Sequence, residues 1–539
     1  MEFNLADLFE NAVDHFGERE YVVADGKRCT YAEMDARANR LAHHLAANGV
    51  GAGDHVGIYA YNSIEWVETL WAVFKIRAVW VNINFRYVED ELAYIFDNAD
   101  LKALVVAREF CPRVAAVRES LNVLKHVVVI DDGTETVVPS GFVSADYEEA
   151  IAGGSPERDF GPRSPDDHYI LYTGGTTGMP KGVVWRQKDV FFALGGGNDA
   201  QTGERAKRPE DMIEWAKRDP NQRCTLPIAP LMHGASQWAV MGGSFVGGKI
   251  VLIPKFDASE AWRLVEEEKV GVLMITGDAM GRPLVESLSG DGHDRDISTL
   301  FLVVSTAAVF SPTVKDDFFE YLPNLLIIDS IGASESGNNG MALITKGNTA
   351  MLGGGPTVKA GPDTTVLDEN LEPVKAGSGI RGKVGRSGDI PIMYYKDPEK
   401  TAETFVTAKD GRRYAVPGDW AMLEEDGTIT LLGRGSVSIN SGGEKIYPEE
   451  VEAAVKDFPD AYDAVVVGVP DERFGSRVAA VVQPRDGATV ELEALQNHCR
   501  TKIAGYKIPR ELHIVDAIER SPSGKPDYRW AKSIATGEA

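Results

Sequence analysis

The residues best suited to chemistry lie in one glycine-rich segment, residues 172–182, with the sequence YTGGTTGMPKG. The segment follows an apolar run at residues 169–171, a pattern typical of a strand that ends in a loop. Glycines let backbone N–H groups approach an anion closely. Threonine hydroxyls donate to phosphate oxygens, and Lys181 adds a positive charge. The segment therefore predicts a loop that binds phosphates, and in particular those of a nucleotide.

The spacing differs from the Gly-x-x-x-x-Gly-Lys-Ser/Thr loop, because Lys181 stands between Pro180 and Gly182. Taken as a generic string, it also fits a surface turn without a ligand. The whole string resembles the signature loop of the adenylate-forming superfamily, which includes acyl-CoA synthetases, peptide-synthetase adenylation domains and firefly luciferase. A glycine, Gly174, replaces the usual serine. The resemblance implies that Thr176 also assists catalysis and Mg²⁺ binding. It implies phosphate binding by Thr173, Gly174, Gly175, Thr176, Thr177, Gly178 and Lys181.

A second string, DSIGASE at residues 329–335, follows an apolar run and resembles the superfamily's Tyr-Gly-x-Thr-Glu element. The resemblance implies that Glu335 acts in catalysis and holds Mg²⁺, since a hard cation needs oxygen ligands. It implies contacts with the nucleotide for Asp329, Ser330 and Ser334. In isolation, the string also fits a strand followed by a capped turn. Ile331 replaces the usual aromatic residue, so we expect stacking to come from elsewhere or the pocket to be more aliphatic.

Three more strings, PGDW, GRGS and GGEK, follow in the superfamily's order. Asp419, in PGDW, would accept from both ribose hydroxyls, because a carboxylate suits two O–H donors. Arg434 would contact ribose or phosphate beside a hinge at residues 434–436, where Ser436 replaces the usual Asp or Lys. The last string, GGEK, would border the pantetheine tunnel of coenzyme A through Gly442, Gly443 and Lys445.

Two candidate catalytic residues complete the resemblance. Lys525, in SPSGK, would enter the site and bridge the carboxylate and the α-phosphate, whose like charges meet in the reaction. By itself, a lysine in such a polar tail is usually solvated. His233, in PLMHG, resembles a Pro-x-Phe-His segment beside the acyl pocket and would gate the pocket or orient the carboxylate. A structural histidine is the alternative.

Strands and helices must position these residues. The sequence predicts strands at 55–61, 103–107, 126–130, 249–254, 271–276, 300–305 and 325–329, and helices at 31–48, 63–74 and 89–98. This alternation indicates an α/β fold with largely parallel sheets. Residues 380–433 indicate a β-rich subdomain, and 195–222 an exposed insertion without an assigned role. We expect an N-terminal adenylation domain at 1–433, a hinge at 434–436 and a small, mobile α+β lid at 437–539.

The lid pattern is compact. A helix begins near Tyr447, strands follow at 464–469 and 477–483, a helix spans 491–504 and a strand spans 511–515.

The whole chain has 539 residues and a net charge of −25, from 56 Lys and Arg against 81 Asp and Glu. This charge disfavours binding to nucleic acid or to membrane surfaces by bulk electrostatics.

The four cysteines are scattered, as is typical of free thiols in a reducing cytosol. We expect a cytoplasmic protein without signal peptide or membrane span, and a homodimer is compatible with the sequence.

The hypothesis is an AMP-forming acyl-CoA ligase that uses ATP, Mg²⁺ and coenzyme A. Resemblance to bacterial steroid side-chain CoA ligases suggests a bulky apolar acid, either steroid-derived or a medium-to-long-chain fatty acid. Ile331 and the glycines at 353–355 are compatible with a roomy pocket. Two alternatives are a ligase that loads a carrier protein and a nucleotide-binding protein without turnover.

Overall fold

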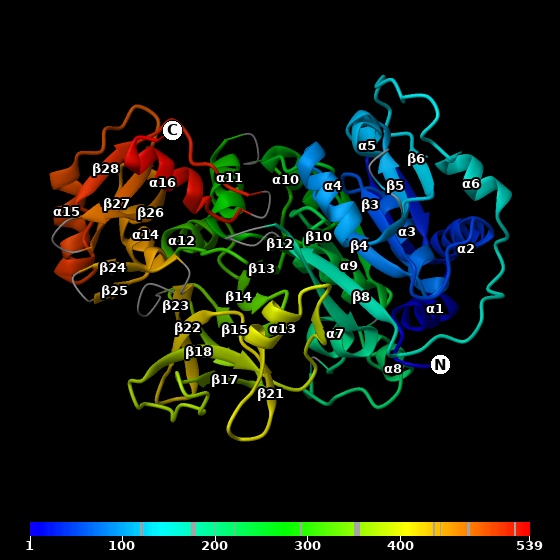
Figure 1. Cartoon of the computed structure of the whole chain (residues 1–539). Coiled ribbons are helices and arrows are strands. Elements are labelled where there is room, and N and C mark those ends of the chain that lie inside the picture. Colours follow the sequence, from blue (N-terminus) through cyan, green and yellow to red (C-terminus); the bar gives the residue numbers. More distant parts are fainter. Residues whose placement is uncertain are drawn as a thin grey trace. The chain divides into compact units, whose positions relative to one another are not determined.

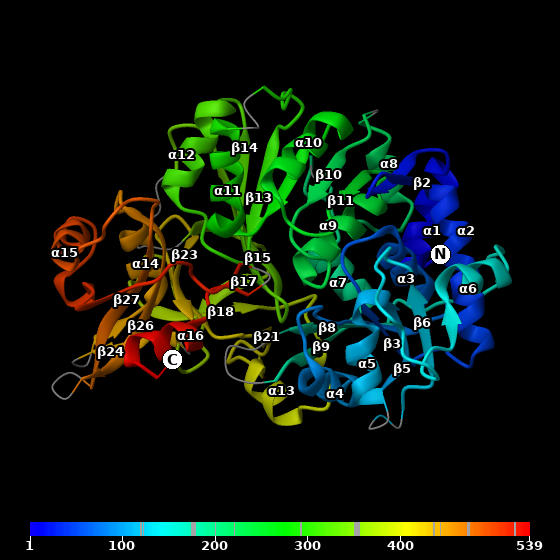
Figure 2. The same cartoon turned by 90° about the horizontal axis from the view of Figure 1, so that it is seen from above.

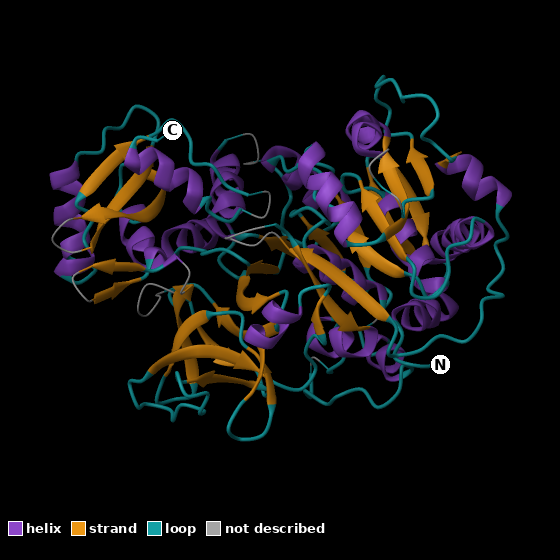
Figure 3. Ribbon diagram, in the orientation of Figure 1, coloured by secondary structure: helices purple, strands orange, loops and turns teal. Residues whose placement is uncertain are grey.

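The computed structural model describes residues 1–539 with the exception of 119–120, 122, 174–178, 200, 220, 291–293, 350–355, 435–436, 442–443, 472–474, 522–523 and 539. The chain divides into two compact units. The first comprises Met1–Met274, Asp294–Leu300 and Asp389–Phe405, and the second comprises Ile275–His293, Phe301–Gly388 and Val406–Ala539. Figure 1 labels their elements, and Figure 3 distinguishes helices from strands.

An eight-stranded sheet runs through the described part of the first unit. Its order is β19 (Met393–Tyr394), β9 (Lys181–Arg186), β8 (His168–Thr173), β4 (Val79–Asn82), β3 (His55–Tyr59), β5 (Leu101–Ala107), β6 (His126–Ile130) and β7 (Ala145–Asp146). The six strands from β8 to β7 in this order run parallel to one another. Strand β9 is antiparallel to both β8 and β19. Every residue of β3 and β6 is buried, which explains their uninterrupted apolar runs.

A second set of strands in the first unit has the order β2 (Lys27–Thr30), β1 (Glu20–Ala24), β11 (Lys249–Leu252), β10 (Cys224–Pro227) and β12 (Val272–Ile275). The helical elements of this unit are α1 (Leu5–Phe16), α2 (Tyr31–Ala47), α3 (Ile64–Lys75), α4 (Glu89–Asn98), η1 (Arg108–Phe110), α5 (Cys111–Arg118), α6 (Tyr147–Gly153), α7 (Gln187–Leu194), α8 (Asp211–Ala216), α9 (Gly234–Ser244), α10 (Ala258–Glu268) and α13 (Pro398–Thr404). Polar caps begin the early helices: Thr30 forms a capping box with Glu33, and Ser63 accepts from the Trp66 N–H. The predicted alternation of strands and helices is confirmed.

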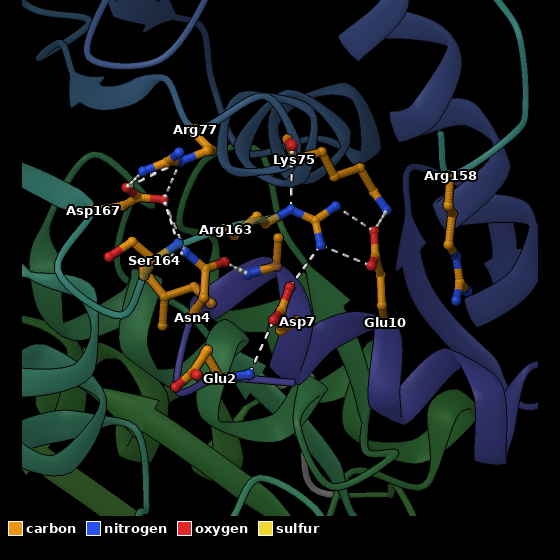
Figure 4. Close-up of polar contacts among 12 residues, drawn as sticks. Glu2, Asn4, Asp7, Glu10, Lys75, Arg77, Arg158, Arg163, Ser164 and Asp167 are labelled. Carbon is orange, nitrogen blue, oxygen red and sulfur yellow. Dashed lines mark hydrogen bonds and ion pairs between the residues drawn. The ribbon is translucent and has the colours of Figure 1, made fainter. Parts of the chain in front are cut away.

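Buried ion pairs hold the segment that leads into β8 (Figure 4). The guanidinium of Arg163 donates to Asp7 at 2.7 Å and to Glu10 at 2.8 Å, and Lys75 Nζ lies 2.5 Å from a Glu10 oxygen. Burial by itself would raise the pKa of Glu10, but Lys75 and Arg163 outweigh it and lower that pKa. Arg163 thus ties the segment before β8 to α1, and β8 ends at the phosphate-loop candidate.

The region at 195–222 is less exposed than the sequence suggests. Met212 and Ile213 of α8 are 2% exposed, and Asn11 of α1 donates to the Pro209 carbonyl at 3.3 Å. The expectation of an exposed insertion therefore fits most of the described residues in this stretch but not α8, which buries two apolar side chains.

The second unit continues with a mostly antiparallel sheet. Its order is β13 (Leu302–Thr306), β14 (Leu326–Ala333), β15 (Gly337–Ile344), β16 (Thr357–Ala360), β23 (Thr428–Arg434), β22 (Asp419–Leu423), β18 (Arg381–Arg386), β21 (Arg413–Ala415) and β20 (Phe405–Thr407), and β17 (Thr364–Leu367) pairs with β18. Strands β13 and β14 are parallel. Helices α11 (Gly277–Ser289) and α12 (Pro312–Tyr321) lie beside them in both views (Figures 1 and 2). The β-rich character expected at 380–433 is confirmed, although α13 interrupts it and Asp389–Phe405, with β19, belong to the first unit.

The C-terminal part is a small α+β domain with a core on each face of its sheet. It contains β24 (Ile439–Ser441), β25 (Glu444–Ile446), α14 (Pro448–Lys456), β26 (Ala461–Asp471), β27 (Gly475–Pro484), α15 (Leu492–Arg500), η3 (Gly505–Lys507), β28 (Glu511–Ile514) and α16 (Tyr528–Thr536). Alternate residues of β26 point to opposite faces: Val466 packs with α14 and α15, and Val465 packs with α16. The predicted second helix ends earlier than expected, at Arg500 instead of 504.

Candidate active site

The phosphate-loop candidate is held at both ends by sheet pairing. Thr173 is the last residue of β8, Lys181 is the first of β9, and the two are direct partners across the antiparallel pair. The Tyr172 backbone N–H donates to Asn82 Oδ1 at 2.8 Å. The loop residues Gly174, Gly175, Thr176, Thr177 and Gly178 lie outside the described residues. The register of β8 and β9 therefore determines where this loop leaves and rejoins the sheet.

Lys181 forms an ion pair with Asp397, a residue that the sequence reasoning missed. Asp397 is also the N-cap of α13, where its Oδ1 accepts the Lys400 N–H at 2.9 Å. The hydrogen bond from Lys181 is the main cause that lowers the pKa of Asp397. The Asp-Pro-Glu string before α13 is a recognisable helix start and could have directed attention to this residue. The contact fits a lysine that tethers the end of the loop.

Asn82, the last residue of β4, joins the loop to the His233 segment. This buried amide donates to the Tyr172 carbonyl at 2.9 Å and to the Met232 carbonyl at 2.6 Å. His233 immediately precedes α9. A Cβ on Gly234 would lie 2.5 Å from Leu171 Cδ2, so a larger residue here would require the Leu171 side chain to move. No motif singled out Asn82, because its role depends on three segments that are distant in sequence.

In the second unit, strand β14 presents Asp329 and Ser330 on opposite faces. Asp329 is 8% exposed and forms an ion pair with the fully buried Lys315 of α12. Burial raises the pKa of Asp329, and Lys315 opposes that rise. Ser330, on the other face of the strand, is partly exposed. Ser334 and Glu335 follow in the turn to β15, both partly exposed.

Ile331 has a different environment from the one expected. It is 7% exposed and belongs to a core cluster that includes Val358, Val384 and Ile429. Its aliphatic side chain therefore packs in the interior of the β-rich region, which favours the alternative that stacking comes from elsewhere. The glycines at 353–355, offered for the same pocket, lie outside the described residues.

Asp419 and Arg434, the two ribose candidates, are direct partners in the pairing of β22 with β23. Side chains of directly paired residues begin about 4.5–5.5 Å apart, so two residues 15 positions apart in sequence meet at one place. Beside them, Gly433 has a φ of +123°, and a Cβ there would lie 2.3 Å from Glu449 Oε2. The Arg434 side chain and residues 435–436 of the predicted hinge lie outside the described part.

The coenzyme A and lysine candidates belong to the C-terminal domain. Lys445 lies on β25, paired with Asn440 of β24, and its side chain is outside the described residues, as are Gly442 and Gly443. Lys525 is exposed and stands in a turn closed by a backbone bond from the Ser521 N–H to the Lys525 carbonyl at 2.8 Å.

Comparison with known proteins identifies the family of the chain. The AMP-binding enzyme family matches residues 9–390, and the AMP-binding enzyme C-terminal domain matches residues 450–525. The 3-oxocholest-4-en-26-oate–CoA ligase of Rhodococcus rhodochrous is 53% identical over 99% of this chain and 96% of its own length. The medium/long-chain-fatty-acid–CoA/3-oxocholest-4-en-26-oate–CoA ligase of Mycobacterium tuberculosis is 51% identical over 98% of this chain and 95% of its own.

Solved structures agree at the level of the fold. The anthranilate CoA ligase AuaEII in complex with anthranoyl-AMP has a TM-score of 0.83 at 23% identity, covering 99% of this chain and 98% of that one. ATP-bound MatB from Rhodopseudomonas palustris has a TM-score of 0.81 at 24% identity, covering 99% of both chains. The chain belongs to the AMP-binding enzyme family, and within it to the acyl-CoA ligases. Among the helices of the described residues, none has the length and apolar character needed to cross a membrane.

Proposed function

We propose that the protein activates a bulky apolar carboxylic acid with ATP and transfers the acyl group to coenzyme A. The observation that carries this proposal is the identity of 50–53%, over 98–99% of the chain, with relatives named for ligation of steroid side chains or medium/long-chain fatty acids to CoA. Since that identity spans both family domains, the substrate proposal rests on the whole chain instead of one motif.

In the first reaction, a carboxylate oxygen of the acid attacks the α-phosphorus of ATP. The bond between that phosphorus and the bridging oxygen of the leaving group breaks, which yields acyl adenylate and pyrophosphate. Because two anions approach each other, a cation placed at the forming bond lowers the barrier. We assign this role to Lys525, whose exposed side chain stands on a tight turn.

The same proposal gives the nucleotide its contacts. The ribose lies against Asp419 and Arg434, which are cross-strand partners. The phosphates lie against the loop between Thr173 and Lys181. Glu335 is a partly exposed residue whose carboxylate is the kind of ligand that a hard cation needs, and with Thr176 it would hold Mg²⁺. When bound, the cation neutralises charge on the phosphate oxygens.

In the second reaction, the sulfur of coenzyme A loses its proton and attacks the acyl carbonyl carbon. The bond from that carbon to the phosphate oxygen breaks, so acyl-CoA and AMP are formed. The proposal includes a rotation of the C-terminal domain about residues 434–436 between the two reactions. Lys525 serves the first, and the strand region around Gly442, Gly443 and Lys445 borders pantetheine in the second. We place this activity in the cytoplasm, where ATP and coenzyme A are available.

The test is a pyrophosphate-release assay with ATP, Mg²⁺ and coenzyme A across short, long, aromatic and steroid side-chain acids. The proposal expects release and a CoA thioester with apolar acids, and little turnover with short polar ones. Release without a CoA thioester, combined with acyl transfer to a phosphopantetheinyl carrier, would favour the carrier-loading alternative. Nucleotide binding without release across the panel would favour a binding protein without turnover.

A further inference from the structure

The turn that carries Lys525 is closed by bonds to Ser521. The Ser521 N–H donates to the Lys525 carbonyl at 2.8 Å, and the Lys525 N–H donates to Ser521 Oγ at 3.1 Å. The Gly524 N–H donates to the Ser521 carbonyl at 2.8 Å, and Arg520 pairs with Pro526 as an isolated β-bridge. The position of the Lys525 backbone therefore follows the position of the chain at residues 520–521.

Arg520 links this turn to the sheet of the C-terminal domain. Its Nη1 donates to the Gly524 carbonyl at 2.8 Å, directly before Lys525. Its Nε and Nη2 donate to the two carboxylate oxygens of Asp463 on β26, at 2.7 and 2.6 Å. A guanidinium can make these three bonds at once because its donors form a rigid planar fork. One side chain thus joins the lysine turn to β26, an edge strand of the three-stranded sheet.

The pair is shielded and reinforced from behind. Side-chain exposure is 14% for Arg520 and 16% for Asp463, and the 6% exposed Lys456 of α14 lies 3.5 Å from Asp463. Burial by itself would raise the pKa of Asp463, but Lys456 and Arg520 outweigh it and hold that pKa at about 2. Asp463 is therefore ionised throughout the physiological range, and the fork geometry of Arg520 is maintained.

The turn is confined on a second side by α11. Gly524 has a φ of +72°, and a Cβ there would lie 3.0 Å from Ala279 Cβ and 3.3 Å from the Thr276 carbonyl. Gly524, whose carbonyl accepts from Arg520, therefore also packs closely against the start of α11. The backbone before Lys525 has little room to adjust without losing one of these contacts.

We propose that Arg520, oriented by Asp463, is a positioning residue for Lys525 in adenylate formation. This inference rests on the proposed function, in which Lys525 acts in the first reaction. Arg520 does not touch the reactants; it fixes the carbonyl preceding the catalytic lysine. A misplacement of about 1 Å at a reacting group can lower a rate about 100-fold. Loss of the guanidinium should therefore slow the first reaction and spare the second.

The control is a second ion pair in the same domain. Arg477 of β27 pairs with Glu511 of β28, and neither residue contacts residues 520–526 through a described bond. Arg477 also lies 3.5 Å from Asp471 of β26, so R477A removes an arginine and two ion pairs from the same sheet without removing a described bond to the lysine turn. The test variants are R520A, R520K and D463N, with K525A as the reference for loss of the lysine itself.

Two activity assays and one structural assay test the inference. ATP–pyrophosphate exchange measures adenylate formation, and thioester formation from supplied acyl adenylate measures the second reaction. R520A should lower the first about 100-fold with little change in the second, R520K and D463N should fall in between, and R477A should resemble wild type. Hydrogen exchange over residues 519–527 should accelerate in R520A and remain unchanged in R477A, whatever the substrate.

Each of these assays has a result that would overturn the proposed role of Arg520. Equal loss of both reactions in R520K and D463N, or an equal loss in R477A, would mean a general structural role. Unchanged exchange over 519–527 in R520A would mean that the arginine does not hold the turn. Wild-type protein that releases no pyrophosphate with any acid would refute the proposed function instead, and the exchange measurement would still decide whether Arg520 holds the turn.

Discussion

Replacing Lys315 by methionine tests the buried ion pair under strand β14. Lys315 is fully buried, its partner Asp329 has 11% side-chain exposure, and the Lys315 ammonium lies 5.4 Å from the Phe310 ring centroid. Methionine keeps most of the apolar stem but removes the charge. The variant therefore leaves a buried carboxylate without the ammonium that the structure provides for it.

The expected loss follows from this burial. Removing one partner of a buried pair destabilises a protein by about 3–5 kcal/mol, because the remaining charge is uncompensated. With each 1.4 kcal/mol equal to a factor of ten, this lowers the folding equilibrium constant by more than about 100-fold. The double variant K315M/D329N removes both charges, and we expect it to recover a large part of the loss.

The loss should also depend on pH. Burial raises the pKa of Asp329 above its ordinary value of 3.8, and Lys315 opposes the rise, so the variant raises it further. A carboxyl with a raised folded-state pKa contributes stability below its unfolded pKa and loses that contribution as pH rises through the folded value. The difference between wild type and K315M should therefore be small near pH 4 and largest at neutral pH and above.

Urea denaturation at several pH values measures this difference. The matched control is K409M, which breaks an ion pair with Glu372 in the same unit, where both side chains are more than half exposed. Exposed pairs contribute little, so K409M should leave the midpoint almost unchanged. A loss in K315M no larger than in K409M, or one that does not vary with pH, would refute the assignment of Lys315 as the counter-ion of Asp329.

Three further predictions concern other parts of the molecule. K525A should lower adenylate formation about 100-fold or more while sparing thioester formation from supplied acyl adenylate; equal losses in the two assays would contradict its role. G433A should destabilise the protein more than G411A. Both glycines have a positive φ, but of the two only Gly433 has a neighbour that an added Cβ would meet. Thermal denaturation of the two variants measures the difference. The loss of stability of D463N relative to wild type should shrink as pH falls from about 4 through 2, because the pKa of Asp463 is about 2 against an ordinary 3.8. Urea denaturation at several pH values measures this loss, and a loss that does not vary with pH would contradict the prediction.

Local sequence was sufficient for much of the fold. Helix α4 (Glu89–Asn98) and strand β6 (His126–Ile130) have the predicted bounds, since their apolar periodicities are properties of short segments. The C-terminal α+β pattern was also readable, although its second helix ends at Arg500. The expectation of an exposed insertion at 195–222 missed α8, because this polar stretch contains two buried side chains, Met212 and Ile213.

For the candidate site, the sequence by itself determined which residue types are available for chemistry: the glycine loop before Lys181, Glu335, Asp419 and Lys525. Only the tertiary structure decided their partners. Asp397 lies 216 positions from Lys181, and Asp463 lies 57 positions from Arg520. The tertiary structure also places Ile331 in a hydrophobic core. The physical reason is that a motif records local backbone preference and functional groups, whereas burial and ion pairing depend on segments that meet only when the chain folds.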